Sequence, residues 1–117
     1  MANYRRTATG NWSTLAEWED DNSGSYAASS TLPGAADVVY ANGFTTTLDV
    51  DVTVLELRNT TGTNVNGGGE FRTSTGCDTV TADIIAGTVS CVRNFVLEDK
   101  VIVGNLYGGS GVNAHAF

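Results

Sequence analysis

Apolar and polar residues alternate along much of this chain, a pattern that is typical of β-strands. The clearest example is the segment 44–54, where four apolar residues share one side of an extended chain: Leu48, Val50, Val52 and Val54. Asp49 and Asp51 share the opposite side. The alternation reverses at Leu55 and Leu57, and this slip predicts a β-bulge or a corner of the chain at that point.

Residues 79–95 and 101–117 align with each other without a gap, at an offset of 22 residues (79 to 101). The aligned pairs include Val80 with Ile102, Thr81 with Val103, Ile84 with Leu106, Gly87 with Gly109 and Phe95 with Phe117. A repeat of about 20 to 50 residues is typical of solenoid proteins. The repeat therefore predicts two stacked coils, whose buried apolar column is Val80, Ile84, Ile102 and Leu106. A β-meander with glycine-rich hairpin turns is the alternative.

The predicted fold class is all-β: a short β-solenoid, similar to a β-helix, with glycine-rich corners and an N-terminal capping segment that contains two tryptophans. Fourteen glycines and one proline agree with many corners, and only residues 13–20 could form a short helix. Residues 38–41 are a predicted strand that ends in an Asn42-Gly43 turn. Residues 59–69 are a predicted loop before Glu70-Phe71-Arg72. Residues 1–36 are interpreted as a cap and loop segment and 37–117 as the solenoid-like domain, together forming one compact unit.

Trp12 and Trp18 lie six positions apart, with Leu15 between them. Such a large apolar area is unfavourable in water, so we expect the two indoles to be structural and to cap the open end of the first coil. An exposed platform that stacks against sugar rings is the alternative.

The chain has 6 basic and 13 acidic residues and a net charge of −7, which argues against a groove for nucleic acid. A run of acids, Glu17, Glu19, Asp20 and Asp21, is interpreted as a solvated face. Residues 20–24 lack the twelve-residue ligand spacing and the closing glutamate of a calcium loop. We expect no metal and no cofactor.

Cys77 and Cys91 are the two cysteines, and neither belongs to a CxxC motif. Zinc is therefore not expected, and buried or half-buried thiols are the prediction, with a disulfide as the alternative. The chain contains no apolar run of membrane-spanning length, and residues 1–6 lead directly into polar sequence rather than a signal peptide. We therefore expect synthesis in the cytoplasm without secretion by that route and no membrane partner.

Residues that could support catalysis are few. His115 is the one histidine, and no Ser, Cys or Asp is placed by the sequence to act with it. Asp49 and Asp51 could form a carboxylate pair of the kind that glycoside hydrolysis requires, but alternation on an exposed strand face explains them equally well. We therefore expect no enzymatic activity and no catalytic residue.

Short motifs follow one another in a characteristic order: Gly10-Asn-Trp12, Trp18, Leu32-Pro-Gly-Ala-Ala-Asp-Val-Val-Tyr-Ala-Asn-Gly43 and Thr47-Leu-Asp49. In this order they resemble the opening of the β-solenoid structural proteins of tailed bacteriophages. Residues 82–87 and 104–115 resemble the coils that those proteins repeat many times. The resemblance covers most of the chain, and its motifs consist of turn glycines and core positions.

The resemblance implies a virion structural protein, made in the host cytoplasm and located on the capsid surface. Its role would be that of a capsid decoration (cement) protein that binds the major capsid protein or other virion proteins. The alternative is a carbohydrate-binding, tail-fibre or adhesin-type β-solenoid module, such as the N-terminal part of a tail-fibre-like protein. We further expect a homo-oligomer, a trimer first and a dimer second, because the last coil has an uncovered edge. The predicted protein-interface residues are Tyr107, Val112 and Phe117.

Overall fold

The structure is a computed structural model that describes residues 2–58, 69–86, 95–96, 101–107 and 112–113. These residues form short strands and a three-residue 3₁₀ helix, η1 (Leu15–Glu17), arranged in two sheets. Sheet A contains β1 (Asn3–Arg6), β3 (Trp18–Asp20), β4 (Ala27–Ala28), β5 (Val38–Tyr40), β7 (Val52–Thr53), β8 (Glu56–Arg58), β10 (Thr79–Ala86) and β12 (Val101–Tyr107). Sheet B contains β2 (Gly10–Asn11), β6 (Thr45–Leu48), β9 (Glu70–Thr73), β11 (Phe95–Val96) and β13 (Val112–Asn113).

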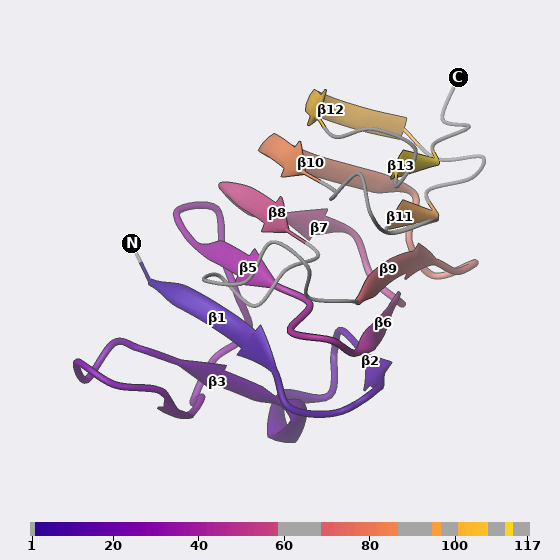
Figure 1. Ribbon diagram of the computed structural model, residues 1–117. Coiled ribbons are helices and arrows are strands. Elements are labelled where there is room, and N and C mark those ends of the chain that lie inside the picture. Colours follow the sequence, from indigo (N-terminus) through magenta and orange to yellow (C-terminus); the bar gives the residue numbers. More distant parts are fainter. Residues whose placement is uncertain (1, 59–68, 87–94, 97–100, 108–111, 114–117) are drawn as a thin grey trace.

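From β5 onward the chain passes back and forth between the two sheets (Figure 1). In sheet A the strand order is β12-β10-β8-β5-β1-β3-β4, and β7 pairs with β10 beside β8. The order in sheet B is β13-β11-β9-β6-β2, and all of its pairs are parallel. Sheet A is mixed, because β3 runs antiparallel to both β1 and β4.

The expected all-β class is confirmed: the described chain consists mostly of strands and has almost no helix. The single helical turn falls inside the one segment where the sequence allowed a helix. A solenoid is not shown, because the molecule is a small sheet-rich unit whose sheets combine parallel and antiparallel pairs. None of its described helical residues forms a segment long and apolar enough to cross a membrane.

The predicted pairing of Val80 with Ile102 is present in the parallel ladder between β10 and β12. It holds from Thr79 to Ala82, after which the register moves by one residue, so that Ile85 rather than Ile84 pairs with Leu106. The predicted column is therefore wrong at Ile84, which is half-buried, whereas Ile85 is fully buried.

A β-bulge explains this shift of register. The backbone N–H groups of Asp83 and Ile84 both donate to the carbonyl oxygen of Leu55, at 2.9 and 3.3 Å. An extra residue in one strand exchanges the faces to which the following side chains point. The gap-free repeat in the sequence could not reveal such an insertion.

The same arrangement occurs one strand earlier and explains the slip at Leu55 and Leu57. The N–H groups of Leu55 and Glu56 both donate to the carbonyl oxygen of Asp37, at 2.9 and 3.3 Å. The predicted bulge is thus confirmed. The predicted strand 44–54 is instead two strands, β6 and β7, separated by a corner at which Val50 is 37% exposed.

The second half of the predicted repeat differs more strongly. Phe95 pairs with Phe71 on one side and Val112 on the other, so its predicted match with Phe117 is wrong, and Phe117 itself lies outside the described residues. Gly87 and Gly109, which the repeat aligned, also lie outside them. Of the predicted loop 59–69 only Gly69 is described, and Phe71, two residues later, is fully buried.

The Asn42-Gly43 turn is confirmed, since both residues have positive φ, 55° and 86°. The N–H of Phe44 donates to the carbonyl oxygen of Ala41 at 3.1 Å and closes the turn. Asn-Gly commonly joins two antiparallel strands of a hairpin. Here it directs the chain from β5 in sheet A to β6 in sheet B.

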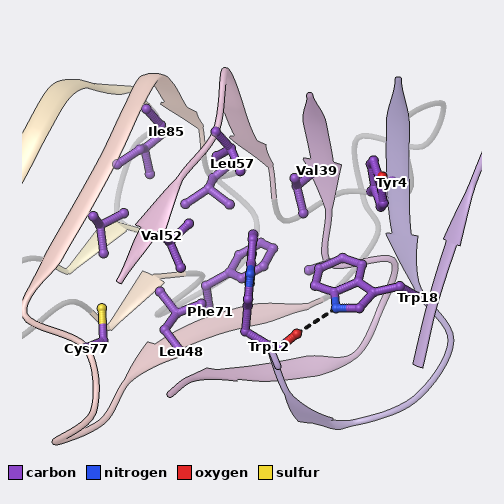
Figure 2. Packing of buried hydrophobic residues seen from close by; sticks show 14 of the residues in the cluster. Tyr4, Trp12, Trp18, Val39, Leu48, Val52, Leu57, Phe71, Cys77 and Ile85 are labelled. Atoms are coloured by element: carbon purple, nitrogen blue, oxygen red, sulfur yellow. Dashed lines mark hydrogen bonds between the residues drawn. The ribbon is translucent and has the colours of Figure 1, made fainter. Parts of the chain in front are cut away.

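One hydrophobic cluster fills the space between the sheets (Figure 2). In sheet A its inward residues are paired in register across four neighbouring strands: Tyr4, Val39, Leu57 and Ile85. The cluster also includes both tryptophans, Leu48 and Phe71. The segment 1–36 therefore shares the core of the later strands and already contributes β1 and β2 to the two sheets.

Candidate functional site

The first candidate site is the edge of sheet A formed by β12. Within the described chain β12 pairs with β10 alone, and it is the terminal strand in the order of the sheet (Figure 1). Val103, near the middle of this strand, is 49% exposed. The N–H and C=O groups along a strand edge can pair with a strand of another chain. The β12 edge is therefore a candidate protein interface.

Two of the three predicted interface residues lie on this side of the molecule. Tyr107 is the last residue of β12, and Val112 is the first residue of β13, the terminal strand of sheet B. Phe117, the third, and His115 lie outside the described residues. The interface role of the three residues stays a prediction.

The tryptophans lie at the other end of the core. Trp12 and Trp18 are 3% and 1% exposed, and their ring centroids are 4.9 Å apart in an edge-to-face arrangement. The indole Nε1–H of Trp18 donates to the carbonyl oxygen of Trp12 at 2.8 Å (Figure 2). Because neither ring is open to solvent, the alternative of an exposed sugar-stacking platform is wrong for this pair. The capping role stays a prediction.

A buried arginine accompanies the tryptophans. The Arg6 side chain is fully buried, and its Nη2 lies 2.8 Å from Oε1 of Glu17. Its guanidinium carbon lies 4.7 Å from the centroid of the Trp18 ring, a distance typical of a cation–π contact. Burial lowers the pKa of Arg6, and the charge of Glu17 opposes this change. Gly10 leaves room for this carboxylate, because a Cβ there would overlap Glu17 Oε1.

The interpretation of the acidic run 17–21 as a solvated face is wrong, because these acids are paired or buried. Glu17 pairs with Arg6, and Glu19 pairs with Arg5 at 2.9 Å. Asp20 is 9% exposed, and the carboxylate of Asp21 accepts two hydrogen bonds from Asn3. Glu17, Glu19 and Asp21 thus have their partners on β1, whereas Asp20 accepts a hydrogen bond from the N–H of Asn22.

Asp49 and Asp51 are also structural in this arrangement. The carboxylate of Asp49 accepts hydrogen bonds from the backbone N–H and the hydroxyl of Ser13. Oδ1 of Asp51 accepts from the N–H groups of Asp78 and Thr79, at 2.7 and 3.2 Å. The two carboxylates therefore hold segments that precede and follow them in the chain.

The Cys77 thiol is fully buried, as predicted, and its Sγ lies 3.7 Å from the carbonyl oxygen of Thr79. Cys91 lies outside the described residues. No group of three or more His, Cys, Asp or Glu side chains is placed to hold a metal ion in the described part of the chain.

A polar row on the outer face of sheet A was not anticipated from the sequence. It crosses four neighbouring strands in register: Glu19, Arg5, Tyr40 and Arg58. Glu56 and Tyr26 flank it, since Nη2 of Arg58 lies 2.6 Å from Glu56 and the guanidinium carbon of Arg5 lies 4.0 Å from the Tyr26 ring centroid. We call these six residues the Tyr–Arg row.

No protein-family model, curated protein or solved structure matches this chain.

Proposed function

We propose that this chain is a short β-solenoid that serves as a non-enzymatic structural subunit of a virion, and that the β12 edge joins it to other subunits. The observation that carries the proposal is the position of β12 as a long terminal strand with a single described neighbour. Decoration of a capsid through the major capsid protein is the role expected from the resemblance to phage β-solenoid proteins.

The solenoid interpretation is supported by the parallel pairs in both sheets. Segments 18 to 35 residues apart in sequence lie side by side, as in the pairs of Tyr40 with Arg58 and Arg5 with Tyr40. The bulge at the start of β8 and the bulge in β10 also follow one another across the sheet, through the carbonyl groups of Asp37 and Leu55. A chain that winds in successive coils, each contributing a strand to both sheets, stacks equivalent segments in this way.

The structural role is supported by the engagement of the ionisable residues that might otherwise serve chemistry. Asp49, Asp51 and Asp21 all bind backbone N–H groups of neighbouring segments. Asp49 and Asp51 satisfy donors beside turns, and Asp21 satisfies the N–H at the start of β1, so each carboxylate stabilises the fold locally. Their hydrogen bonds therefore have a sufficient explanation in the fold.

The edge is tested by a charge placed on it. Val103→Lys adds a cation to β12, and lysines on edge strands oppose pairing with another chain. Thr53→Lys is the matched control, because Thr53 is exposed and lies in the same register column as Thr81 and Val103, but on β7, on the opposite side of β10. Analytical ultracentrifugation of the purified protein over a range of concentrations then measures association.

We expect the wild-type protein to associate, as a trimer first and a dimer second, and Val103→Lys to weaken this association while Thr53→Lys does not. A monomer at every concentration, or an equal effect of both lysines, would contradict the role of the edge. Mass spectrometry of purified particles tests the virion assignment separately. Absence of the chain from intact particles would remove that assignment.

A further inference from the structure

From the Tyr–Arg row we infer a second binding surface: the outer face of sheet A takes a neutral, hydroxyl-rich oligosaccharide, which lies along the row across β1, β5 and β8. This site differs from the buried tryptophans and from the β12 edge. Glycan binding at this site is therefore a second function, and it does not depend on the proposed structural role.

The residues of the row are held in place before any ligand arrives. Nε of Arg5 donates to Oε1 of Glu19 at 2.9 Å, and Nε of Arg58 donates to Oε1 of Glu56 at 2.7 Å. Arg5 also covers the ring of Tyr26. Side chains that are already ordered lose little conformational entropy when a ligand binds.

The two ion pairs remain partly open to solvent. The side chains of Arg5 and Arg58 are 35% and 37% exposed, and Tyr26 and Tyr40 are half-buried. Burial raises the pKa of Tyr40, opposed by Arg58 and assisted by Glu56 and Asp21. Burial also raises the pKa of Tyr26, with Asp21 and Tyr40 contributing. The register of Tyr40 between Arg5 and Arg58, and the contact of Arg5 with the Tyr26 ring, place both phenols beside the ion pairs.

The chemistry of the row favours a neutral ligand that has both donors and acceptors. Each guanidinium is matched by a carboxylate, so the four charged side chains sum to zero and exert little attraction on an ion. A carboxylate accepts hydrogen bonds and a guanidinium donates them. Neighbouring hydroxyls of a sugar ring can donate to the first and accept from the second. The apolar face of the same ring can pack on Tyr40.

The spacing of the row suits a chain of linked rings. Neighbouring strands lie about 4.8 Å apart, so Arg5 and Arg58, which flank Tyr40, lie on strands separated by about 10 Å. A linear oligosaccharide crossing the strands would meet an ion pair, the tyrosine and a second ion pair in turn. A second copy of this chain, docked through the same face, fits less well. A two-fold axis at Tyr40 would place Arg5 of one copy opposite Arg58 of the other, and like charges repel.

A matched control exists on the other sheet. Glu70 and Arg72 on β9 repeat the Glu-x-Arg arrangement of Glu56 and Arg58 on β8, with an ion pair of 2.7 Å. On β6 the register partners of this pair are Thr45 and Thr47, and on β11 Arg72 pairs with Val96, so these described partners include no tyrosine. Arg72→Gln therefore removes the same kind of charge from the same kind of pair outside the row.

The experiment applies labelled protein to an array of neutral and acidic glycans, followed by NMR titration with the neutral hexasaccharide that is best retained. We expect a neutral glycan to bind, Tyr40→Ala and Arg58→Gln each to weaken binding at least tenfold, and Arg72→Gln to leave it unchanged. Tyr40→Phe retains the ring and should retain most of the binding, which separates stacking from loss of fold. Circular dichroism verifies that each variant is folded.

The inference is overturned if no neutral glycan is retained above the level of Tyr40→Ala, or if Arg72→Gln weakens binding as much as Arg58→Gln. Retention of acidic glycans alone would also overturn it, because recognition would then depend on charge. Val103→Lys should leave glycan binding intact. Failure at the row is thus distinguishable from failure at the β12 edge.

Discussion

The two ends of sheet A are built differently. At one end the antiparallel strands β3 and β4 lie beyond β1 and cover its edge. The strands become shorter from β1 to β4. At the other end β12 is seven residues long and has β10 as its described neighbour. Short or covered edges prevent pairing with other chains, whereas a long exposed edge invites it. The comparison indicates that sheet A is closed at its N-terminal end, whereas no described strand covers the edge of β12, where we propose the contact.

The closed end also contains a closely packed group of aromatic rings. Trp18 on β3 contacts the rings of Tyr4 and Trp12, with centroids 6.2 and 4.9 Å away, and lies beside the guanidinium of Arg6. Val103, in contrast, leaves almost half of its surface in water. Substitutions at the two ends should therefore affect different properties: stability at the first and association at the second.

The largest effect is expected for Trp18→Ala. It removes a fully buried indole, its hydrogen bond to Trp12 and its contact with Arg6, and truncation of a buried tryptophan costs about 3–5 kcal/mol. Urea or thermal unfolding measures the loss. Val103→Ser at the open edge should change the free energy of unfolding by no more than about 0.5 kcal/mol.

Leu15→Ala is the control at the closed end, since Leu15 lies between the two tryptophans in sequence but is 38% exposed. Its effect should be small compared with that of Trp18→Ala. If Trp18→Ala and Val103→Ser destabilised the protein equally, the contrast between the two ends would be lost.

A smaller effect is expected for Glu17→Gln, which leaves the buried Arg6 guanidinium without its carboxylate. Loss of a hydrogen bond to a buried charge costs about 1–3 kcal/mol, and Glu17 is itself only 24% exposed. The double variant Glu17→Gln/Arg6→Met should regain part of this loss because the buried charge is then absent. Chemical denaturation of the wild type and the three variants measures the coupling. Additive losses would show that the pair does not act as a unit.

The sequence predicted the features that depend on neighbours along the chain. The burial of Leu48, Val52 and Val54, the Asn42-Gly43 turn and the burial of Cys77 follow from local chemistry, and the structure has them, although a corner at Val50 interrupts the alternation. Local pattern also located the bulge at Leu55, because an inserted residue exchanges the two faces of a strand. It could not locate the bulge at Asp83, since Ile84 and Ile85 are both apolar and conceal the exchange.

Features that depend on register between distant strands were missed. Arg5, Tyr40 and Arg58 are far apart in sequence, and only the pairing of β1, β5 and β8 brings them into one row. The burial of Arg6 had no signal either, because an arginine between polar residues looks solvent-exposed until β3 covers it. The Glu-x-Arg spacing at 56–58 and 70–72 was the one available hint of ion pairs along the strands.

The smallest effect is expected for the pH dependence that Asp21 gives to the closed end. Backbone and side-chain hydrogen bonds from Asn3 lower the pKa of the Asp21 carboxyl below its usual range. A carboxyl whose pKa is lower in the folded protein stabilises the fold above its unfolded value of about 3.9. This contribution is lost as the pH falls through the folded pKa, and it is modest because the group is accessible to water.

Melting temperatures of the wild type and Asp21→Ala should therefore differ at about pH 6 and converge towards about pH 2. Asp78→Ala, at an exposed carboxyl near the corner that Asp51 holds, is the control, and the same convergence there would remove the assignment to Asp21.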